Sequence, residues 1–514
     1  MRSYVGITVG PIFDTICDAS TPAALWFASS LFSDVTKRIC AAVTGPEGLE
    51  EVQIYSPYYS PEITMEDGVG KFHDRIIFSA VNFEAERLNA LLKKVKRETV
   101  LAFPEVLRGT EAEDFFEEYL QLHYVVKREE QIGAENSVLV LSPYLDALEL
   151  MKTFPKDDAV NPIRRLFLGE KNNGNKYIKE SPLFQRVPKE ANQFRSRDDS
   201  IWTVEEVASW HDRITESWKR KHYYAVVSAD GDEMGKFLKQ ISSEQVTEFS
   251  KACLEYDEAA AALIGAYGGM TIYAGGDDLL FLAPLMTEEG NVFQLCHNIQ
   301  QMFREKIRAC ASFEKLEVIP SISFSVSIQY AKYPLYEALD SSRYLLALAK
   351  KDGDFANTCC RKNNMLIGLQ KHSGQSLALL VSNEQYGLLE QFLQIDSASE
   401  NKELHSVLYT LENFRSMIFV LNRKAREEQE FSERYLAAWY NFFDNAGQKT
   451  AKEYIRKICM TYYESLVLPE KKGISVPVHG LTEDFTEEEN ADASLKTLLY
   501  LLKLKQFLTE KEGA

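Results

Sequence analysis

Two stretches decide the fold of this chain: YYAVVSAD at 223–230 and MTIYAGGDDLLFLAP at 270–284. The first has the composition of a buried strand, and the second contains two short apolar strands separated only by GGDD at 275–278. Such a short connection predicts a tight hairpin, in which glycine supplies the positive φ that other residues avoid. If the first strand lies beside the hairpin, its end and the hairpin tip meet at one edge of a sheet.

Three acidic residues at this predicted edge, Asp230, Asp277 and Asp278, are candidate metal ligands. Carboxylates packed closely together repel one another and are costly without a cation. Mg²⁺ prefers oxygen ligands, and two such ions stabilise the attacking and leaving oxygens in phosphoryl transfer. The pattern therefore predicts a two-metal (Mg²⁺ or Mn²⁺) nucleotidyltransferase site, although GGDD alone is often only a solvated hairpin turn.

Four further residues complete the predicted site. The backbone carbonyl of Gly231 is a candidate fourth oxygen ligand for the metals. Because Gly275 and Gly276 lack side chains, a triphosphate can approach the hairpin. Lys350, near the end of a predicted helix, is a candidate ligand of the phosphate oxygens, with a solvated helix terminus as the alternative interpretation.

The residues around the hairpin predict an α+β domain at 222–385. A capping box formed by Ser242 and Gln245 begins a helix that runs to about residue 267. Further on, helices are predicted at 292–309 and 335–350 and strands at 319–330 and 364–369. The resulting order is β-α-β-β-α-β-α-β.

The rest of the chain divides into three predicted domains. Residues 1–155 alternate strands and helices in a ferredoxin-like order, with strands at 4–9, 75–81 and 123–127 and helices at 23–43, 83–100 and 144–153. This resembles the order in 222–385 and suggests a duplication, although the stretch at 55–74 lacks paired acids. Residues 156–221 are polar and loop-rich, apart from a helix at 201–220. Residues 386–514 are nearly all helical, with an acidic stretch at 483–489.

Composition excludes several classes of protein. No apolar run reaches the roughly 18 residues that a membrane-spanning helix needs, and the N-terminus does not read as a signal peptide, so we expect a cytoplasmic protein without membrane contact. The eight cysteines contain no C-x-x-C pair, and Cys359-Cys360 has no second pair, so zinc is not expected. There is no Walker A motif. A free-standing nucleic-acid binder would more often be basic, so with a net charge of −18 we expect any contact with nucleic acid to be made through a local patch or through partner subunits.

Five segments resemble the large subunit of type III CRISPR effector complexes, the CRISPR polymerase. SADGDEMGKFL (228–238), GGMTIYAGGDDLLFLAP (268–284) and SVSIQYAKYPLYEALDSSRYLLALAKK (325–351) are similar to its second palm domain. VGPIFDTICDASTPAALWFASSLFSDV (9–35) resembles the opening of its first palm, and NMLIGLQKHSG (364–374) also fits. The order of these segments looks most like the Cmr-type (III-B) branch.

The resemblance implies two adenylyl-cyclase-like palms, a small domain between them and a helical C-terminal domain. It implies that the second palm joins ATP into cyclic oligoadenylates when the complex, with its other subunits and crRNA, captures target RNA. It also implies that Asp230, Asp277 and Asp278 bind the metals.

Departures from the family pattern leave alternatives open. The first palm opens at Tyr4 without an HD nuclease domain, so DNA cleavage is not expected. Some relatives without this domain conjugate ATP to S-adenosylmethionine, and the metal-binding acids would be the same. A diguanylate cyclase and a non-catalytic scaffold subunit are the remaining alternatives. The H-D dipeptides His73-Asp74 and His211-Asp212 are typical of metal phosphohydrolases, but with few other histidines we interpret both as structural.

Overall fold

The computed structural model of this chain divides into two compact units. The first comprises Met1–Trp210, Ala229–Ser321 and Ala331–Leu339, and the second comprises His211–Ser228, Ile322–Tyr330 and Asp340–Ala514. The structure describes residues 1–133, 136–151, 160–173, 176–188, 203–209, 222–351, 362–395, 402–428, 432–443, 449–469, 473–476 and 493–509. The predicted acidic stretch at 483–489, the Cys359-Cys360 pair and His211-Asp212 lie outside these residues.

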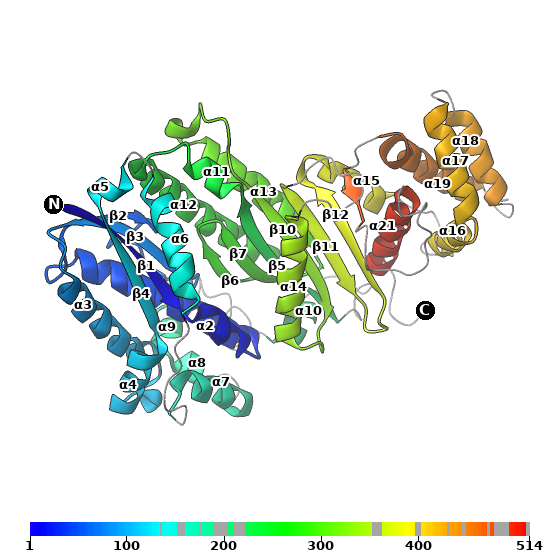
Figure 1. The fold of residues 1–514 in the computed structure, drawn as a ribbon. Coiled ribbons are helices and arrows are strands. Elements are labelled where there is room, and N and C mark those ends of the chain that lie inside the picture. The colour runs from blue at the N-terminus through cyan, green and yellow to red at the C-terminus, as the bar shows by residue number, and fades with distance from the viewer. Residues whose placement is uncertain are drawn as a thin grey trace. The chain divides into compact units, whose positions relative to one another are not determined.

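The N-terminal part of the first unit is built on a four-stranded sheet in the order β2-β3-β1-β4 (Figure 1). Its strands are β1 (Arg2–Gly10), β2 (Glu50–Ser56), β3 (Arg75–Val81) and β4 (Gln121–Arg128). β1 is antiparallel to both β3 and β4. The strands predicted at 4–9, 75–81 and 123–127 are confirmed, whereas β2 was not predicted.

The helices α2 (Pro22–Thr44) and α6 (Ser137–Glu149) pack against this sheet, and α3 (Ala85–Glu98) packs against α2. α2 begins after Thr21, whose side chain accepts a hydrogen bond from Ala24 N–H, and most of its residues are buried. α6 begins earlier than the predicted helix at 144–153, because Asn136 caps it and Pro143 is accommodated inside the helix. The polar segment predicted as loop-rich contains α7 (Pro162–Asn173), α8 (Lys176–Glu180), α9 (Pro182–Gln185) and α10 (Val204–Ala208).

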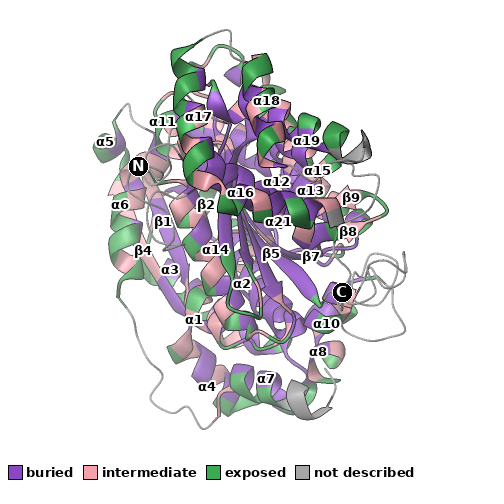
Figure 2. Ribbon diagram, turned by 90° about the vertical axis from the view of Figure 1, so that its right-hand side faces the viewer, coloured by how far each residue is buried: buried purple, intermediate pink, exposed green. Residues whose placement is uncertain are grey.

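A second sheet has seven strands in the order β13-β12-β11-β10-β5-β7-β6. Its strands are β5 (Tyr223–Asp232), β6 (Met270–Gly275), β7 (Asp278–Pro284), β10 (Ser321–Tyr330), β11 (Asn364–Gln370), β12 (Ser376–Ser382) and β13 (Ile474–Ser475). β6 and β7 form the predicted hairpin, and β10 pairs with β11 in parallel. β5 and β7 are among the most deeply buried strands (Figure 2).

Three helices of the central domain follow the predicted order: α12 (Ser243–Tyr267), α13 (Val292–Arg308) and α14 (Leu335–Ala349). A short helix before them, α11 (Met234–Leu238), was not predicted. The capping box at Ser242 and Gln245 is present, and Gly268 ends α12 in the left-handed conformation. Because these end signals are local, the sequence located this helix to within a residue. β12 was not predicted, although its residues SLALLVS are apolar.

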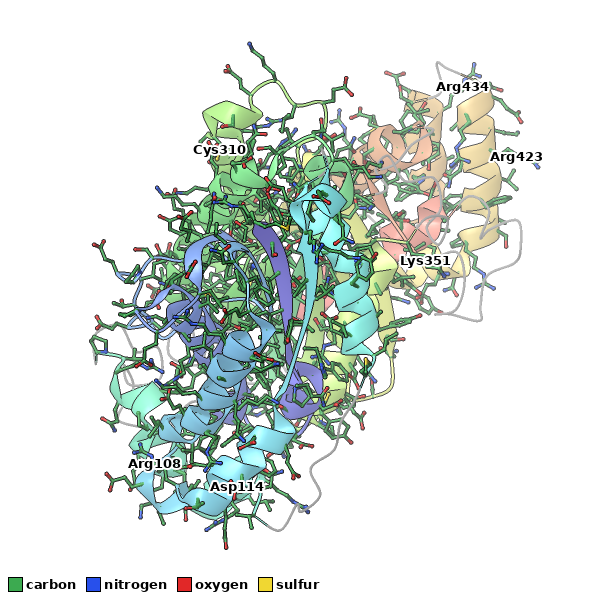
Figure 3. The ribbon with its side chains drawn as sticks, turned by 60° about the vertical axis from the view of Figure 1, so that its left-hand side comes forward. Arg108, Asp114, Cys310, Lys351, Arg423 and Arg434 are labelled. Carbon is green, nitrogen blue, oxygen red and sulfur yellow. The ribbon has the colours of Figure 1, made fainter. Side chains whose placement is uncertain are left out.

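The C-terminal part of the second unit is mainly helical, with α15 (Tyr386–Gln394), α16 (Lys402–Asn413), α17 (Arg415–Glu427), α18 (Ser432–Phe442), α19 (Lys449–Tyr462) and α21 (Ser494–Thr509). α21 is buried along most of its length and packs against α15, α16 and β12. Arg423 on α17 and Arg434 on α18 extend into solvent (Figure 3). The prediction of helices from residue 386 onward omitted β13, which pairs with β12.

The two compact units follow a different division from the four domains predicted at 1–155, 156–221, 222–385 and 386–514. The boundary between the units crosses β5, because Ser228 is assigned to the second unit and Ala229 to the first. The four-domain division therefore stays a prediction.

Candidate functional site

The GGDD hairpin has a two-residue turn formed by Gly276 and Asp277. Gly275 and Asp278 are the last paired residues of β6 and β7. Gly276 has a φ of +78°, whereas Asp277 is not among the residues with positive φ. Positive φ at the first of two turn residues is the pattern of a type II′ turn, which prefers glycine there. The predicted tight hairpin is confirmed, and the conformational freedom of glycine is used at Gly276.

The Asp277 side chain lies directly on the backbone of β5. A methyl group placed on Gly231 would be 2.4 Å from Asp277 Oδ2 and 2.7 Å from its Cβ. Such close approach is possible only because Gly231 has no side chain. Since β5 and β7 are neighbours in the sheet, the hairpin tip meets the end of β5 at residues 230–232.

The three predicted acids therefore share one end of this sheet. Asp230 and Asp277 are partly exposed and Asp278 is exposed, so all three have access to solvent. Within the described part of the chain, however, no three His, Cys, Asp or Glu side chains form a group arranged to hold a metal ion. The donor set suits Mg²⁺ chemically, because carboxylates are hard oxygen ligands. Metal binding by Asp230, Gly231, Asp277 and Asp278 stays a prediction.

A fourth carboxyl group, that of Asp257, lies behind the hairpin. Asp257 is on α12 and is 1% exposed, and its Oδ2 accepts a hydrogen bond of 3.0 Å from Gly276 N–H. Burial raises the pKa of this carboxyl group well above its usual value, the Gly276 hydrogen bond acts in the opposite direction, and the charges of Asp277 and Asp278 raise it further.

Asp257 was not among the predicted site residues, although the sequence carries a signal for it. On α12, the buried positions Val246, Cys253, Ala260 and Ile264 recur at helical spacing, and Asp257 falls in the same stripe. An acidic residue at a core position of an amphipathic helix is expensive unless it is hydrogen-bonded, and therefore indicates a specific role.

The hairpin borders a pocket of about 370 Å³. On the hairpin side, Gly275, Gly276, Asp277 and Asp278 line it. Facing them are residues from the N-terminal part of the unit and from three helices: Ser56, His73, Asp74, Arg75, Ile77, Val138, Ser142, Met234, Leu238, Val246, Phe249, Ser250 and Cys253. All of these residues belong to the first compact unit. A concave space of this size, with apolar walls and a few polar groups, is the usual form of a small-molecule site.

The dipeptide His73-Asp74, which we interpreted as structural, lines this pocket. A methyl group placed on Gly276 would be 3.6 Å from His73 Cδ2, so the ring is next to the turn. Ser56 Oγ is 3.0 Å from His73 Nε2, and His73 Nδ1 accepts a hydrogen bond of 3.4 Å from Arg75 N–H. Burial and the charge of Arg75 lower the pKa of His73 to about 4, so the ring is neutral near pH 7.

The charged groups beside His73 form a small network. Burial and the charge of Glu149 raise the pKa of Asp74, whereas Arg75 lowers it. The Arg75 guanidinium binds Glu149 at 2.8 Å and Asp146 at 2.7 Å, both on α6. Because two acids already neutralise Arg75, little of its positive charge is available to a ligand in the pocket.

Lys350, the predicted phosphate ligand, directly follows α14 and is assigned to the second compact unit. The role of Lys350 at the hairpin stays a prediction.

Comparison with protein families gives a match for the central part of the chain. Residues 223–359 match the family model described as Cas10/Cmr2, second palm domain. These residues form a Cas10/Cmr2-type palm. The predicted resemblance to the large subunit of type III CRISPR complexes is thereby confirmed for this domain, and the β5-to-α14 segment that carries the three acids lies inside it.

Comparisons with single proteins and with solved structures give further matches. The CRISPR system Cmr subunit Cmr2 of Pyrococcus furiosus is 28% identical over 190 residues, which is 32% of this chain and 20% of that protein. The similarity thus spans about a fifth of the curated relative. A cryo-EM structure of type III-B Cmr-beta in the apo state matches with a TM-score of 0.55 at 12% identity, covering 97% of this chain and 81% of that one.

A crystal structure of a Csm1–Csm4 cassette in complex with cA4 matches with a TM-score of 0.50 at 14% identity, covering 98% of this chain and 70% of that one. At these identities the two structural matches establish a shared α+β fold. None of the described helices is both long and apolar enough to cross a membrane.

Proposed function

We propose that this chain is the nucleotidyltransferase subunit of a type III CRISPR effector complex and makes cyclic oligoadenylate from ATP. The observation that carries the proposal is the position of Asp277 on Gly231, beside Asp230 and at the edge of a 370 Å³ pocket. The palm-domain match of residues 223–359 supports it, as does the fold shared with a Csm1–Csm4 cassette whose structure contains cA4.

The proposed reaction is the joining of two adenosine nucleotides. The 3′-oxygen of one nucleotide bonds to the α-phosphorus of ATP, the bond to the β-phosphate breaks, and pyrophosphate leaves while the hydroxyl proton passes to water. Asp230, Asp277 and Asp278 would hold Mg²⁺ or Mn²⁺, which would neutralise charge on the phosphate oxygens. Gly275 and Gly276 leave room for the triphosphate beside the turn.

The net charge of the protein bears on how it would meet RNA. A net charge of −18 leaves little general attraction for nucleic acid, so we propose that crRNA and target RNA reach this subunit through the other subunits of the complex. We propose that the complex acts in the cytoplasm, where ATP is available. A silent scaffold role does not account for the intact acids Asp277 and Asp278 at the pocket edge.

The charge of the pocket favours a second candidate product. Among the described residues that line it, Arg75 is the only permanently charged base, and Glu149 and Asp146 already bind it. The cations that Asp277 and Asp278 would hold serve the triphosphate of ATP, and the facing residues Asp74 and Arg75 supply no further unpaired positive charge to a second triphosphate. A cationic acceptor such as S-adenosylmethionine, with its sulfonium and ammonium groups, matches the negative charge better. Conjugation of ATP to S-adenosylmethionine is therefore our alternative.

One experiment tests both candidates. The assembled complex is incubated with target RNA, labelled ATP and Mg²⁺ or Mn²⁺, with and without S-adenosylmethionine, and the products are identified by mass spectrometry. We expect a ring of adenylates, or a conjugate that forms only when S-adenosylmethionine is present. The double variant Asp277→Ala plus Asp278→Ala should make neither product.

The matched control is Glu288→Ala plus Glu289→Ala. These two exposed acids lie between the short strands β8 (Met286–Thr287) and β9 (Gly290–Asn291) of the same domain, so the control removes the same charge from another turn. It should retain full activity. Absence of any nucleotide product from the unaltered complex, or full activity of the Asp277/Asp278 variant, would refute the proposed function.

A further inference from the structure

The backbone N–H of Gly276 needs a hydrogen-bond partner from outside the hairpin. In a two-residue turn, the flanking residues Gly275 and Asp278 pair with each other, which leaves the N–H groups of the two turn residues outside the ladder. Buried or partly buried N–H groups are nearly always satisfied in folded proteins. Here Asp257 Oδ2 accepts from Gly276 N–H at 3.0 Å, so the partner comes from α12.

Asp257 is held at this position by packing around it. It is 1% exposed, in a stripe whose neighbours one turn away are Cys253 and Ala260, both buried. Its other oxygen, Oδ1, is buried and has no hydrogen-bond partner among the described residues. Burying a carboxyl group with only one hydrogen-bonded oxygen costs folding free energy. The hydrogen bond from Gly276 N–H is the interaction that accounts for an acid at this buried position.

We propose that Asp257 is a positioning residue that anchors the GGDD turn to α12 and thereby sets where the Asp277 carboxylate lies. The inference rests on the proposed nucleotidyltransferase function and deepens it. The hydrogen bond fixes the peptide plane between Gly275 and Gly276, and Asp277 is the next residue along the chain. Rotation of that plane would move Asp277 relative to Gly231, on which it packs.

A segment of the N-terminal sheet region holds the same hairpin from its open side. Ala274 lies on β6, which is the edge strand of its sheet. Its N–H donates a hydrogen bond of 3.3 Å to the Gly70 carbonyl. Lys71, next in the chain, binds Glu258 of α12 at 2.7 Å. The hairpin is thus held on two sides, and the hydrogen bond from Gly276 N–H to Asp257 fixes the backbone of the turn.

We propose that Asp257 acts through the position of its hydrogen-bond acceptor and not through its charge, and the variants are chosen to separate these two properties. Asp257→Asn keeps an oxygen that can accept from Gly276 N–H without the capacity for charge. Asp257→Leu keeps the volume but removes the acceptor, and Asp257→Ala removes both. Glu255→Ala is the matched control, because Glu255 is an exposed acid on the same helix.

The first readout is hydrogen exchange of the peptide that covers residues 270–281, measured by mass spectrometry on the full chain. Asp257→Leu and Asp257→Ala should increase exchange in this peptide, because the Gly276 amide loses its acceptor and the turn loosens. Asp257→Asn and Glu255→Ala should exchange like the unaltered protein. If Asp257→Leu does not fold, the comparison of Asp257→Ala with Asp257→Asn decides.

The second readout is turnover by the assembled complex. Asp257→Leu should lower kcat by about 10²-fold with a much smaller change in the KM for ATP, since a displacement of about 1 Å at a reacting group costs roughly this much. Asp257→Asn should restore most of the rate. A general loss of stability would instead lower the amount of active enzyme without this rescue.

Two results would overturn the inference: unchanged exchange and kcat in Asp257→Leu and Asp257→Ala, or an Asp257→Asn variant as defective as Asp257→Leu. The exchange measurement does not depend on catalysis. If the unaltered complex makes no nucleotide product, the proposed function fails, and the exchange of the 270–281 peptide still decides whether Asp257 anchors the turn.

Discussion

Replacement of Gly231 by alanine is the sharpest perturbation of this site. The new methyl group would lie 2.4 Å from Asp277 Oδ2 and 3.0 Å from its Cγ, whereas ordinary contacts of this kind begin at 3.4 Å. Gly231 is not among the glycines with positive φ, so alanine fits the backbone and only the contact with Asp277 opposes it. Because β5 is buried in the sheet, the Asp277 side chain and the turn must retreat by about 1 Å.

We expect Gly231→Ala to lower the catalytic rate much more than the stability of the protein. Asp277 is partly exposed on a turn, so it can move, and we expect the stability loss to be near the low end of overpacking, about 1 kcal/mol. A displacement of about 1 Å at a reacting centre costs roughly 10²-fold in rate, equivalent to about 2.7 kcal/mol of barrier. The perturbation should therefore separate activity from stability.

Product formation by the assembled complex and urea unfolding of the chain are measured together. Gly235→Ala on α11 is the control, because a methyl group there would contact nothing within 4 Å. It should leave the rate unchanged. A Gly231→Ala variant with more than a third of the normal rate would refute the reasoning that Asp277 works from its position on Gly231.

Three further predictions concern the surroundings of the pocket. Removal of divalent cations with EDTA should abolish product formation, and added Mn²⁺ should restore it; unchanged activity would contradict the metal site. Because the folded pKa of His73 is about 4 and the unfolded value about 6.5, the unfolded chain binds the proton more readily between them, so stability should fall by at most about 3 kcal/mol as the pH falls from 6.5 to 4. His73→Asn should flatten this part of the pH profile of urea unfolding, and an unchanged profile would exclude a buried neutral ring. Lys71→Met removes ion pairs of 2.6 Å with Asp67 and 2.7 Å with Glu258, and should cost about 1.5–3 kcal/mol in urea unfolding, whereas Lys94→Met, at an exposed pair, should cost almost nothing.

Elements whose signals lie in neighbouring residues were predicted well. The start of helix α12 was located by the capping box of Ser242 and Gln245, its end was predicted at about residue 267, and the hairpin was located by two glycines between apolar strands. Elements without such signals were missed. β2 carries the partly polar sequence EEVQIYS and is paired on one side only, with β3, so its strand character depends on a neighbour from elsewhere in the chain.

The residues of the candidate site likewise fall into those with a local sequence signal and those without one. Asp230, Asp277 and Asp278 were identifiable because each lies at the end of an apolar strand, and strand ends next to tight turns are visible in sequence. Asp257 was missed because its significance depends on the Gly276 N–H that packing brings against it. His73 and Asp74 were interpreted as structural because the chain has few other histidines to complete a metal site. Their contact with the hairpin was missed because about 200 residues separate the two segments, and no local pattern reports a contact at that distance.

The sequence by itself determined the hairpin and the acids at its tip, because turn chemistry and strand periodicity are properties of adjacent residues, and the palm followed from the resemblance of its motifs to a known family. Only the tertiary structure decided what surrounds those acids. Packing of α12 brings Asp257 to the turn, packing of the N-terminal sheet brings His73 and Asp74 to the pocket, and the missing side chain of Gly231 lets Asp277 lie on β5. These contacts join distant segments through buried surface and shape, which neighbouring residues in the sequence do not specify.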